Sequence, residues 1–312
     1  MTSAKPAISI VIPAYQVASL IGETLDSIQR QSFVDWQALI IDDGSTDDLT
    51  SVVQPYLADP RFELHRFANA GLAEARNRGI ALARADKIAF LDGDDIYEPR
   101  YLEVMSGRLD ARPEIGFVTC DMTLFGDPAT EGRRFSEIER QVPPISLERV
   151  LKREFTFAVM CMLRAGVLRA VGGFDPSLRA AEDFDLWTRL LIAGVEADYV
   201  AEPLVRYRRR AGSLSNSPRL FRASIATVYL RLMAALPREP EATICRVYVY
   251  RQLALLDRWE GERALREGRA REARSKLWRA ARHLPGWRGR LVAAVAFISR
   301  RLALAMLDHA DR

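Results

Sequence analysis

The sequence predicts an α/β fold, with helices on both faces of a mainly parallel sheet, followed by an α-helical C-terminal region. Short aliphatic runs alternate with segments of helical periodicity in the first part of the chain, as in parallel βα units. The 312 residues, 49% of them hydrophobic, suffice for one large domain or two modest ones. Strand signals stop near Leu214, so we expect one domain over residues 1–213 and a helical region over 214–312.

Each expected element is a run of residues with strand-like or helix-like periodicity. Strands are expected at residues 8–12, 36–41, 61–67, 87–91, 115–120, 159–163 and 204–208. Helices are expected at residues 17–31, around 52–57, at 71–83, 164–170 and 180–193, and in the C-terminal region at 218–236, 241–257, 259–281 and 287–308. Residues 121–146, rich in Gly and Pro, are expected to be irregular.

Three carboxylates follow the expected strand at 87–91, in the order Asp92-Gly93-Asp94-Asp95. Side chains two apart in an extended segment share a face, so Asp92 and Asp94 can converge. Converging carboxylates repel each other unless a cation or proton lies between them. Mg²⁺ or Mn²⁺ would suit these oxygen ligands and would bring phosphate oxygens with it. Taken alone, however, the segment is better interpreted as an acidic turn.

Two other segments at strand ends support a ligand site. Pro13–Tyr15 and Asp42–Asp43 also follow expected strands, and ligands of parallel sheets bind outside the C-terminal ends of the strands. No Gly-x-Gly-x-x-Gly loop lies near Pro13, which disfavours a dinucleotide-binding dehydrogenase.

The C-terminal part is basic. Residues 251–312 contain 15 Lys/Arg and 7 Asp/Glu, leaving 30 and 34 in residues 1–250. This asymmetry suggests an anionic partner, and a membrane surface is favoured over nucleic acid because no nucleic-acid recognition module accompanies the charge. Residues 287–308 could form a helix lying flat on an anionic membrane. The equally weighted alternative is a last helix packed on the helical region or on a second subunit, and the oligomeric state stays open.

The expected location is the cytoplasm, with peripheral attachment to the inner face of the membrane as an open alternative. The three cysteines, Cys120, Cys161 and Cys245, are far apart and odd in number, which indicates reduced thiols in a reducing compartment. No signal-peptide core and no uninterrupted apolar stretch long enough to span a bilayer is recognisable.

Five motifs occur in a characteristic order: Ser9–Tyr15, Ile41–Asp47, Ala75–Gly79, Leu91–Asp95, and Gly172–Asp175 with Glu182–Trp187. Over roughly residues 6–215 the chain thereby resembles family 2 glycosyltransferases with the GT-A fold. The resemblance implies an inverting enzyme that moves a sugar from a nucleotide diphosphate donor to an acceptor hydroxyl. A carbohydrate or lipid-linked acceptor in surface polysaccharide or glycolipid synthesis would fit.

The resemblance also implies roles for the carboxylates. Asp94 would ligate the divalent metal, with Asp92 contacting metal or ribose. Asp183 would be the general base, with Glu182 beside it at the start of a helix, where the helix dipole favours the carboxylate form. The structural alternative for the Glu182-Asp183 pair is ordinary helix N-terminal charge.

Further residues would hold the substrates. The resemblance implies that Asp43 bonds a uracil or thymine ring, which favours UDP- or dTDP-sugars, and that Arg76 contacts the nucleotide. Pro13, Ala14 and Tyr15 would lie against the base. The structural alternative is an Asx-turn for Asp43 and a solvated helix arginine for Arg76. For Pro13, Ala14 and Tyr15 it is an ordinary strand end. Trp187, one turn after Asp183, could form an apolar wall for the sugar or acceptor.

One segment departs from the family pattern. In Tyr207–Ser213, Arg210 stands where many relatives have a histidine that can join the metal. An arginine cannot ligate a cation, but with Arg209 it could bind the diphosphate directly. The alternative is a solvated basic loop.

Two other functions fit the sequence less well. A sugar-nucleotide-processing nucleotidyltransferase would normally show a glycine- and basic-rich loop near the first strand, which Pro13–Gln16 is not. A degenerate GT-A domain acting as a non-catalytic binding or scaffold protein is disfavoured by the intact carboxylates and slightly favoured by Arg210. The sugar and acceptor stay open, because the irregular 121–158 region would contact them.

Overall fold

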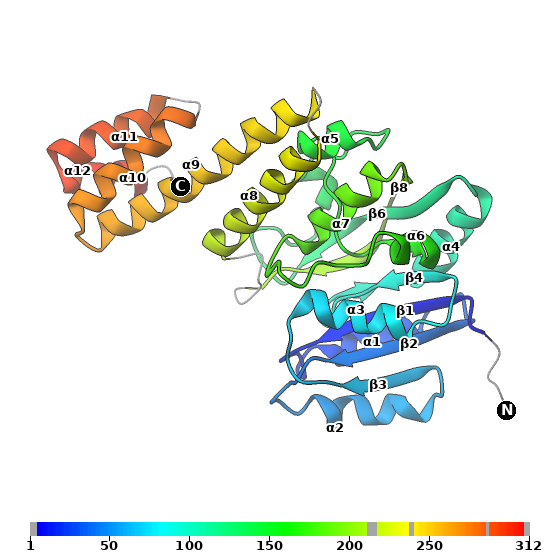
Figure 1. Ribbon diagram of the computed structural model, residues 1–312. Helices are drawn as coiled ribbons and strands as arrows, with labels where there is room; N and C mark the ends of the chain where they lie inside the picture. The colour runs from blue at the N-terminus through cyan, green and yellow to red at the C-terminus, as the bar shows by residue number, and fades with distance from the viewer. Residues whose placement is uncertain (1–4, 211–216, 237–239, 285–286, 309–312) are drawn as a thin grey trace. The chain divides into compact units, whose positions relative to one another are not determined.

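The computed structural model describes residues 5–210, 217–236, 240–284 and 287–308. The chain forms two compact units, Met1–Ala211 and Gly212–Arg312, which are described separately (Figure 1). The expected domain boundary at 213/214 lies outside the described residues.

The first unit is built on one curled eight-stranded sheet, ordered β3-β2-β1-β4-β7-β6-β8-β5. Figure 1 shows its N-terminal part, β3-β2-β1-β4. The strands are β1 (Ile8–Ala14), β2 (Trp36–Asp42), β3 (Phe62–Arg66), β4 (Lys87–Phe90), β5 (Ile96–Tyr97), β6 (Ile115–Phe125), β7 (Met162–Arg164) and β8 (Glu196–Arg208). Neighbours are parallel from β3 to β4 and between β6 and β8, whereas β7 and β5 pair antiparallel. The mainly parallel α/β sheet predicted from the sequence is confirmed.

Helices pack on this sheet: α1 (Ile21–Gln29), α2 (Leu49–Val53), α3 (Leu72–Leu82), α4 (Tyr101–Ala111), α5 (Leu147–Leu151), α6 (Ala165–Ala170) and α7 (Glu182–Ile192). Short 3₁₀ turns occupy Gln54–Ala58 and Phe135–Glu137. Every residue of β1 and β2 is buried, as expected for strands covered on both faces. Helix α3 packs closely on β1 because Gly79 has no side chain: a Cβ there would lie 2.3 Å from Val11 Cγ1.

Several predicted boundaries were wrong. β6 continues to Phe125 and β8 begins at Glu196, because the two strands pair along most of their length even where their residues are polar. Asp121 follows Cys120 within β6, so the apolar run alone ended the predicted strand too early. β7 begins at Met162, three residues later than expected. β5, α4 and α5 were not predicted.

The second unit is helical, as predicted, with α8 (Pro218–Ala235), α9 (Glu241–Arg266), α10 (Ala270–His283), α11 (Trp287–Ile298) and α12 (Arg300–Asp308). The expected break near residue 258 is wrong, since α9 runs through it and ends before Gly268, whose φ of 82° ends the helix. Gly261 instead allows close helix packing, because a Cβ there would lie 2.8 Å from Leu277 Cγ.

The last two helices pack inward. Buried residues of α11 and α12, among them Val292, Ala296, Ala303 and Leu307, join a core with residues of α9 and α10. For residues 287–308 the sequence left two hypotheses: a helix lying on a membrane, or a helix packed on the helical region or on a second subunit. The structure favours packing on the helical region. Among the described residues, no helix is both long and apolar enough to cross a membrane. The three cysteines are free and buried, as expected.

Candidate active site

The acidic segment Asp92–Asp95 forms a tight turn directly after β4. The Asp95 backbone N–H donates to the Asp92 carbonyl at 3.0 Å. The turn lies against the end of β1, since a Cβ on Gly93 would come within 3.1 Å of the Pro13 carbonyl oxygen. Glycine at the centre of the turn thus allows two strand ends to meet, as predicted for a ligand site at this edge of the sheet.

Asp95 anchors the end of β8. Its buried carboxylate accepts the Arg208 backbone N–H at 2.7 Å, and the Arg208 side chain donates to the Asp94 carbonyl at 2.8 Å. Within the described part of the chain, Asp95 Oδ2 has no hydrogen-bond partner. Burial, with the neighbouring charges of Asp94 and Asp92, raises the pKa of Asp95 well above its usual range, and its contacts with Arg208 give this residue a structural role in the cluster.

Arg76, on α3, joins the acidic turn to the start of α7. One terminal nitrogen donates to Asp92 Oδ1 at 2.8 Å and the other to Glu182 Oε1 at 2.5 Å. The side chain is 2% exposed and its guanidinium lies 5.2 Å from the centroid of the Phe174 ring. Arg76 is therefore not a solvated helix arginine, and in this structure it bridges two carboxylates expected at the site.

Asp183 lies in the first turn of α7, beside Glu182. The preceding Ala181 has φ 58°, in the left-handed region that non-glycine residues seldom adopt, and such strain is typical of functional sites. Burial, with the Glu182 charge, raises the pKa of Asp183 to about 6, although Arg76 and Arg153 oppose the shift. Desolvation thus outweighs the helix dipole, and the carboxylate is poised to accept a proton near neutral pH.

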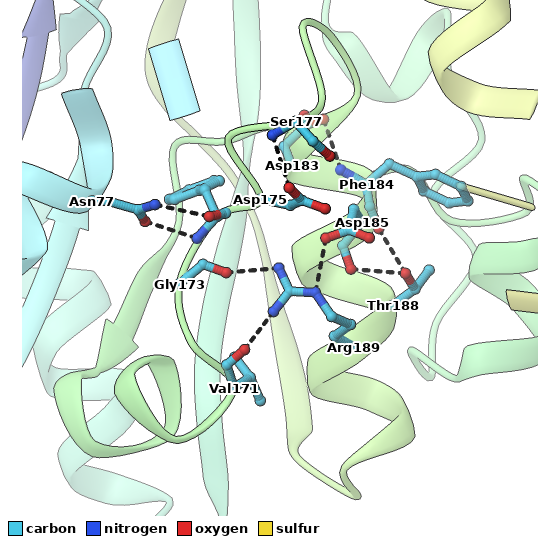
Figure 2. Close-up of polar contacts among 11 residues, drawn as sticks. Asn77, Val171, Gly173, Asp175, Ser177, Asp183, Phe184, Asp185, Thr188 and Arg189 are labelled. Carbon is cyan, nitrogen blue, oxygen red and sulfur yellow. Dashed lines mark hydrogen bonds and ion pairs between the residues drawn. The ribbon is translucent and has the colours of Figure 1, made fainter. Parts of the chain in front are cut away.

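Two side chains that the sequence analysis gave no role hold the loop before α7 (Figure 2). Asn77 brackets Phe174, donating to its carbonyl at 2.8 Å and accepting its N–H at 2.9 Å. Arg189 donates to the carbonyls of Val171 and Gly173, both at 2.6 Å. Asn77 belongs to one of the quoted motifs, so its signal was present; Arg189 could have been found only from its helical spacing to Asp185, which it contacts at 2.8 Å.

Asp43 is held by its own chain. Its carboxylate accepts the backbone N–H groups of Ala70 at 3.0 Å and Gly71 at 2.8 Å, and pairs with Arg78 at 3.1 Å. The side-chain bond that closes the local turn comes from Asp42 instead, whose carboxylate accepts the Ser45 N–H at 2.7 Å. The segment at the end of β1 lies beside it, since the Asp43 N–H donates to the Ala14 carbonyl at 2.9 Å.

The residues at the C-terminal end of β1 differ in their exposure to solvent. Pro13 and Ala14 are buried, whereas the Tyr15 side chain is 50% exposed. Tyr15 therefore offers a ring at the edge of the sheet where the strand ends meet, and Pro13 and Ala14 offer backbone groups.

Arg210 contacts the expected metal ligand. Its Nε donates to Asp94 Oδ2 at 2.8 Å, while the neighbouring Arg209 binds the Phe125 carbonyl through its backbone N–H at 2.8 Å. Burial and the Asp92 charge raise the pKa of Asp94, and Arg210 partly offsets that rise. The rest of the predicted basic loop, Ala211–Ser213, lies outside the described residues.

Trp187 does not line the site. It is 1% exposed and stacks on Phe117 at a centroid distance of 5.5 Å, with Phe157 at 5.6 Å. The expectation of an apolar wall for the sugar or acceptor is therefore wrong. Spacing of four residues from Asp183 placed it on the correct helix side, but that side packs against β6.

The acidic turn fits a divalent cation. Asp92 and Asp94 are 24% and 19% exposed at their side chains, and both provide hard oxygen ligands. Among the described residues no group of three or more His, Cys, Asp or Glu side chains could surround an ion. Mg²⁺-type sites commonly use one or two carboxylates and complete the shell with water and substrate phosphates, so two carboxylates suffice.

Comparison with known proteins agrees with this geometry. Residues 9–171 match the model of the family "Glycosyl transferase family 2". The chain therefore belongs to glycosyl transferase family 2, as the motifs indicated, which makes it a transferase. It is 27% identical to the putative teichuronic acid biosynthesis glycosyltransferase TuaG of Bacillus subtilis over 70% of this chain and 84% of that protein. It is 29% identical to the uncharacterized protein y4gI of Sinorhizobium fredii, covering 69% of this chain but only 24% of that protein.

Solved structures confirm the GT-A fold. Staphylococcus aureus TarS, in complex with UDP-GlcNAc, superposes with a TM-score of 0.64 at 16% identity, over 95% of this chain and 89% of that one. The mannosyltransferase PcManGT of Pyrobaculum calidifontis, in complex with GDP-Man and Mn²⁺, gives a TM-score of 0.62 at 18% identity, over 97% and 84%. At these identities the likeness concerns the fold alone.

Proposed function

We propose that this glycosyltransferase moves a sugar, with inversion, from a nucleotide diphosphate donor to an acceptor hydroxyl. The observation that carries the proposal is the buried bridge of Arg76 between Asp92 and Glu182. Arg76 joins Asp92, which with Asp94 would hold the metal at the donor's diphosphate, to Glu182. The neighbour of Glu182, Asp183, has a raised pKa. Both halves of a displacement reaction are thereby held in one network.

Asp183 is the proposed general base. Its carboxylate takes the proton of the acceptor hydroxyl as that oxygen forms its bond to the anomeric carbon of the sugar. The bond between that carbon and the diphosphate oxygen breaks at the same time, and the nucleotide diphosphate leaves with the electron pair. A pKa of about 6 keeps Asp183 ionised at neutral pH and still basic enough to accept the proton.

The leaving diphosphate needs positive charge. Asp92 and Asp94 would hold Mn²⁺ or Mg²⁺, which when bound supplies Lewis-acid stabilisation of the leaving oxygens. Arg210, already at Asp94, can turn its guanidinium to the phosphates, and Arg209 immediately precedes it in the chain. PcManGT binds Mn²⁺, which supports a divalent cofactor here.

The donor end of the site suits a nucleoside. The exposed Tyr15 ring can stack on a base, and Asp43 lies beside the end of β1. Because the Asp43 carboxylate accepts bonds from its own chain, we expect it to share one oxygen with the imide of a uracil or thymine. We favour UDP- or dTDP-sugars on this ground. TarS binds UDP-GlcNAc, whereas PcManGT binds GDP-Man, so a screen of nucleotide sugars by calorimetry is the first experiment.

The acceptor is proposed to be a carbohydrate or lipid-linked glycan of a surface polysaccharide. The name of TuaG refers to such a polymer, teichuronic acid. Nucleotide sugars and the three free thiols both suit a reducing cytoplasm, which is the proposed location.

Donor turnover separates the enzyme from a non-catalytic nucleotide-sugar binding or scaffold protein. The best-binding sugar nucleotide is incubated with wild type and Asp183→Asn in the presence of Mn²⁺, and released nucleotide diphosphate is measured. We expect turnover only in the wild type, with donor affinity retained in the variant. Binding without turnover in the wild type, for every acceptor tried, would instead support the scaffold function, which the Arg210–Asp94 pair slightly favours.

Arg210 has a separate test with two readouts of opposite sign. Because Arg210 occupies Asp94, Arg210→Ala should bind Mn²⁺ more tightly in the absence of donor, and bind donor more weakly. Arg209→Ala, at the residue immediately before Arg210, is the matched control. It should leave Mn²⁺ affinity unchanged. If Arg210→Ala changes neither donor affinity nor the metal requirement, the proposed role is wrong.

A further inference from the structure

Two aromatic rings project from the outer side of the helical unit, where α10 meets the end of α11. The Trp278 side chain is 46% exposed and that of Phe297 is 52% exposed. Their rings pack edge to face with centroids 6.3 Å apart. Single exposed apolar residues are common on proteins, but two aromatic rings that pack together and stay exposed to solvent form an apolar patch, which is typical of an interaction site.

Arginines surround this pair. The Arg274 guanidinium lies 5.5 Å from the centroid of the Phe297 ring, and its Nε donates to the Ala296 carbonyl at 3.0 Å. Arg271 and Arg282 are exposed and lie on the Trp278 side of α10, since spacings of three, four or seven residues return to one helix face. We call Arg271, Arg274, Trp278, Arg282 and Phe297 the aromatic–arginine face.

The positive charge of this face is not neutralised locally. The basic residues on the side of α10 that meets α9 do have partners, since Lys276 pairs with Glu260 and Arg279 pairs with Asp257 at 2.8 Å. Within the described ranges, by contrast, no ion pair involves Arg271, Arg274 or Arg282. Helix α10 thus separates its charges into a side paired with α9 and an uncompensated outer side.

We propose that the aromatic–arginine face binds the surface of a bilayer that contains anionic phospholipids. Trp and Phe rings favour the membrane–water interface, and guanidinium groups form bidentate hydrogen bonds to lipid phosphates. A second copy of the chain would oppose like charges across the same face, which disfavours self-association. The inference extends the proposed function, because a lipid-linked acceptor lies at such a surface, but the face is distinct from the residues of the catalytic network.

Vesicle co-sedimentation of the full-length protein tests the proposal without donor or acceptor. The wild type should bind vesicles that contain phosphatidylglycerol, bind pure phosphatidylcholine vesicles much less, and dissociate as salt is raised. Trp278→Ala/Phe297→Ala should weaken partitioning about tenfold, since two apolar side chains lose their insertion. Arg271→Glu/Arg282→Glu should weaken it about 25-fold or more, given about fivefold for each arginine removed from an anionic surface.

A matched control lies on α9, where Arg246 and the 56% exposed Val247 also join a charge to an apolar side chain. Arg246→Glu/Val247→Ser should bind vesicles nearly as the wild type does. All variants should keep the wild-type melting temperature and, in free solution, any sugar transfer, so failure of this inference is separable from failure of the proposed function.

Three outcomes would overturn the proposal: equal binding to neutral and anionic vesicles, variants of the face that bind like the wild type, or no vesicle binding at all. In the last case, sedimentation velocity and an oligonucleotide titration would identify self-association or nucleic-acid binding as the use of the face.

Discussion

Replacing Asp183 by Asn should greatly slow transfer and stabilise the protein. Burial and the Glu182 charge raise the pKa of Asp183 from 3.8 to about 6, so the ionised form is disfavoured in the folded state. A carboxyl with a raised pKa destabilises the fold wherever it is ionised, which is above about pH 6, and this cost disappears as the pH falls below its unfolded pKa. Asparagine keeps the shape without the charge.

The magnitude follows from the size of the shift. About two pKa units correspond to about 3 kcal/mol, and the partial exposure of the Asp183 carboxylate reduces this to about 1–2 kcal/mol. In a unit of this size, such a gain raises the melting temperature by about 2 to 8 °C. The expected gain is full at pH 7.5 and disappears towards pH 4. Loss of the general base should lower kcat by about 10²–10⁴.

Calorimetric or fluorescence melts of both proteins from pH 4 to 8, with kcat/KM of the wild type over the same range, provide the assay. Wild-type kcat/KM should rise about tenfold per pH unit below pH 6 and level off above it. Asp35→Asn, at an exposed carboxylate, is the control and should change neither quantity. A variant less stable than wild type at pH 7.5, or a stability difference independent of pH, would refute the reasoning.

Three further substitutions test the packing of the site. Arg76→Leu leaves the buried Glu182 and the partly exposed Asp92 without their cation and should cost about 3 kcal/mol in chemical denaturation, with Arg76→Lys intermediate; wild-type stability in the Leu variant would contradict the bridge. Trp187→Ala should cost about 3–5 kcal/mol, whereas a rise in donor KM at unchanged melting temperature would restore the idea of a sugar-contacting wall. Gly79→Ala forces a Cβ to within 2.3 Å of Val11 and should cost about 1–3 kcal/mol, which the added Val11→Ala change should partly recover in thermal melts.

The sequence was sufficient for the fold class and for the edge of the sheet that carries the site. Aliphatic runs such as those of β1 and β2 are buried along their whole length, and such runs can be recognised in a sequence because a parallel strand covered on both faces admits few polar residues. The turn at Asp92–Asp95 could be located for the same reason, since it follows a strand whose end could be predicted. The C-terminal part of β6 and the N-terminal part of β8 could not be predicted, because strand pairing continues there through polar residues.

Helix periodicity, by contrast, did not show what a side chain faces. Trp187 and Asp183 lie on one side of α7, yet Trp187 is buried on Phe117 while Asp183 stays partly accessible. Spacing defines a helix side, but only the position of that helix on the sheet decides where the core ends and the site begins. The same holds for the expected helix break near residue 258, where α9 is continuous and Gly261 contacts Leu277 closely.

By itself, therefore, the sequence determined most of the order of strands and helices, the family, and the residue types available to hold a diphosphate and a proton. Only the tertiary structure decided their partners: Arg76 with Glu182, 106 positions away in the chain, and Arg210 with Asp94, 116 positions away. Local propensity and spacing extend over a few residues, whereas these ion pairs depend on which strand ends and helix starts the folded sheet brings together. The raised pKa of Asp183, on which its proposed chemistry depends, results from burial in that long-range network.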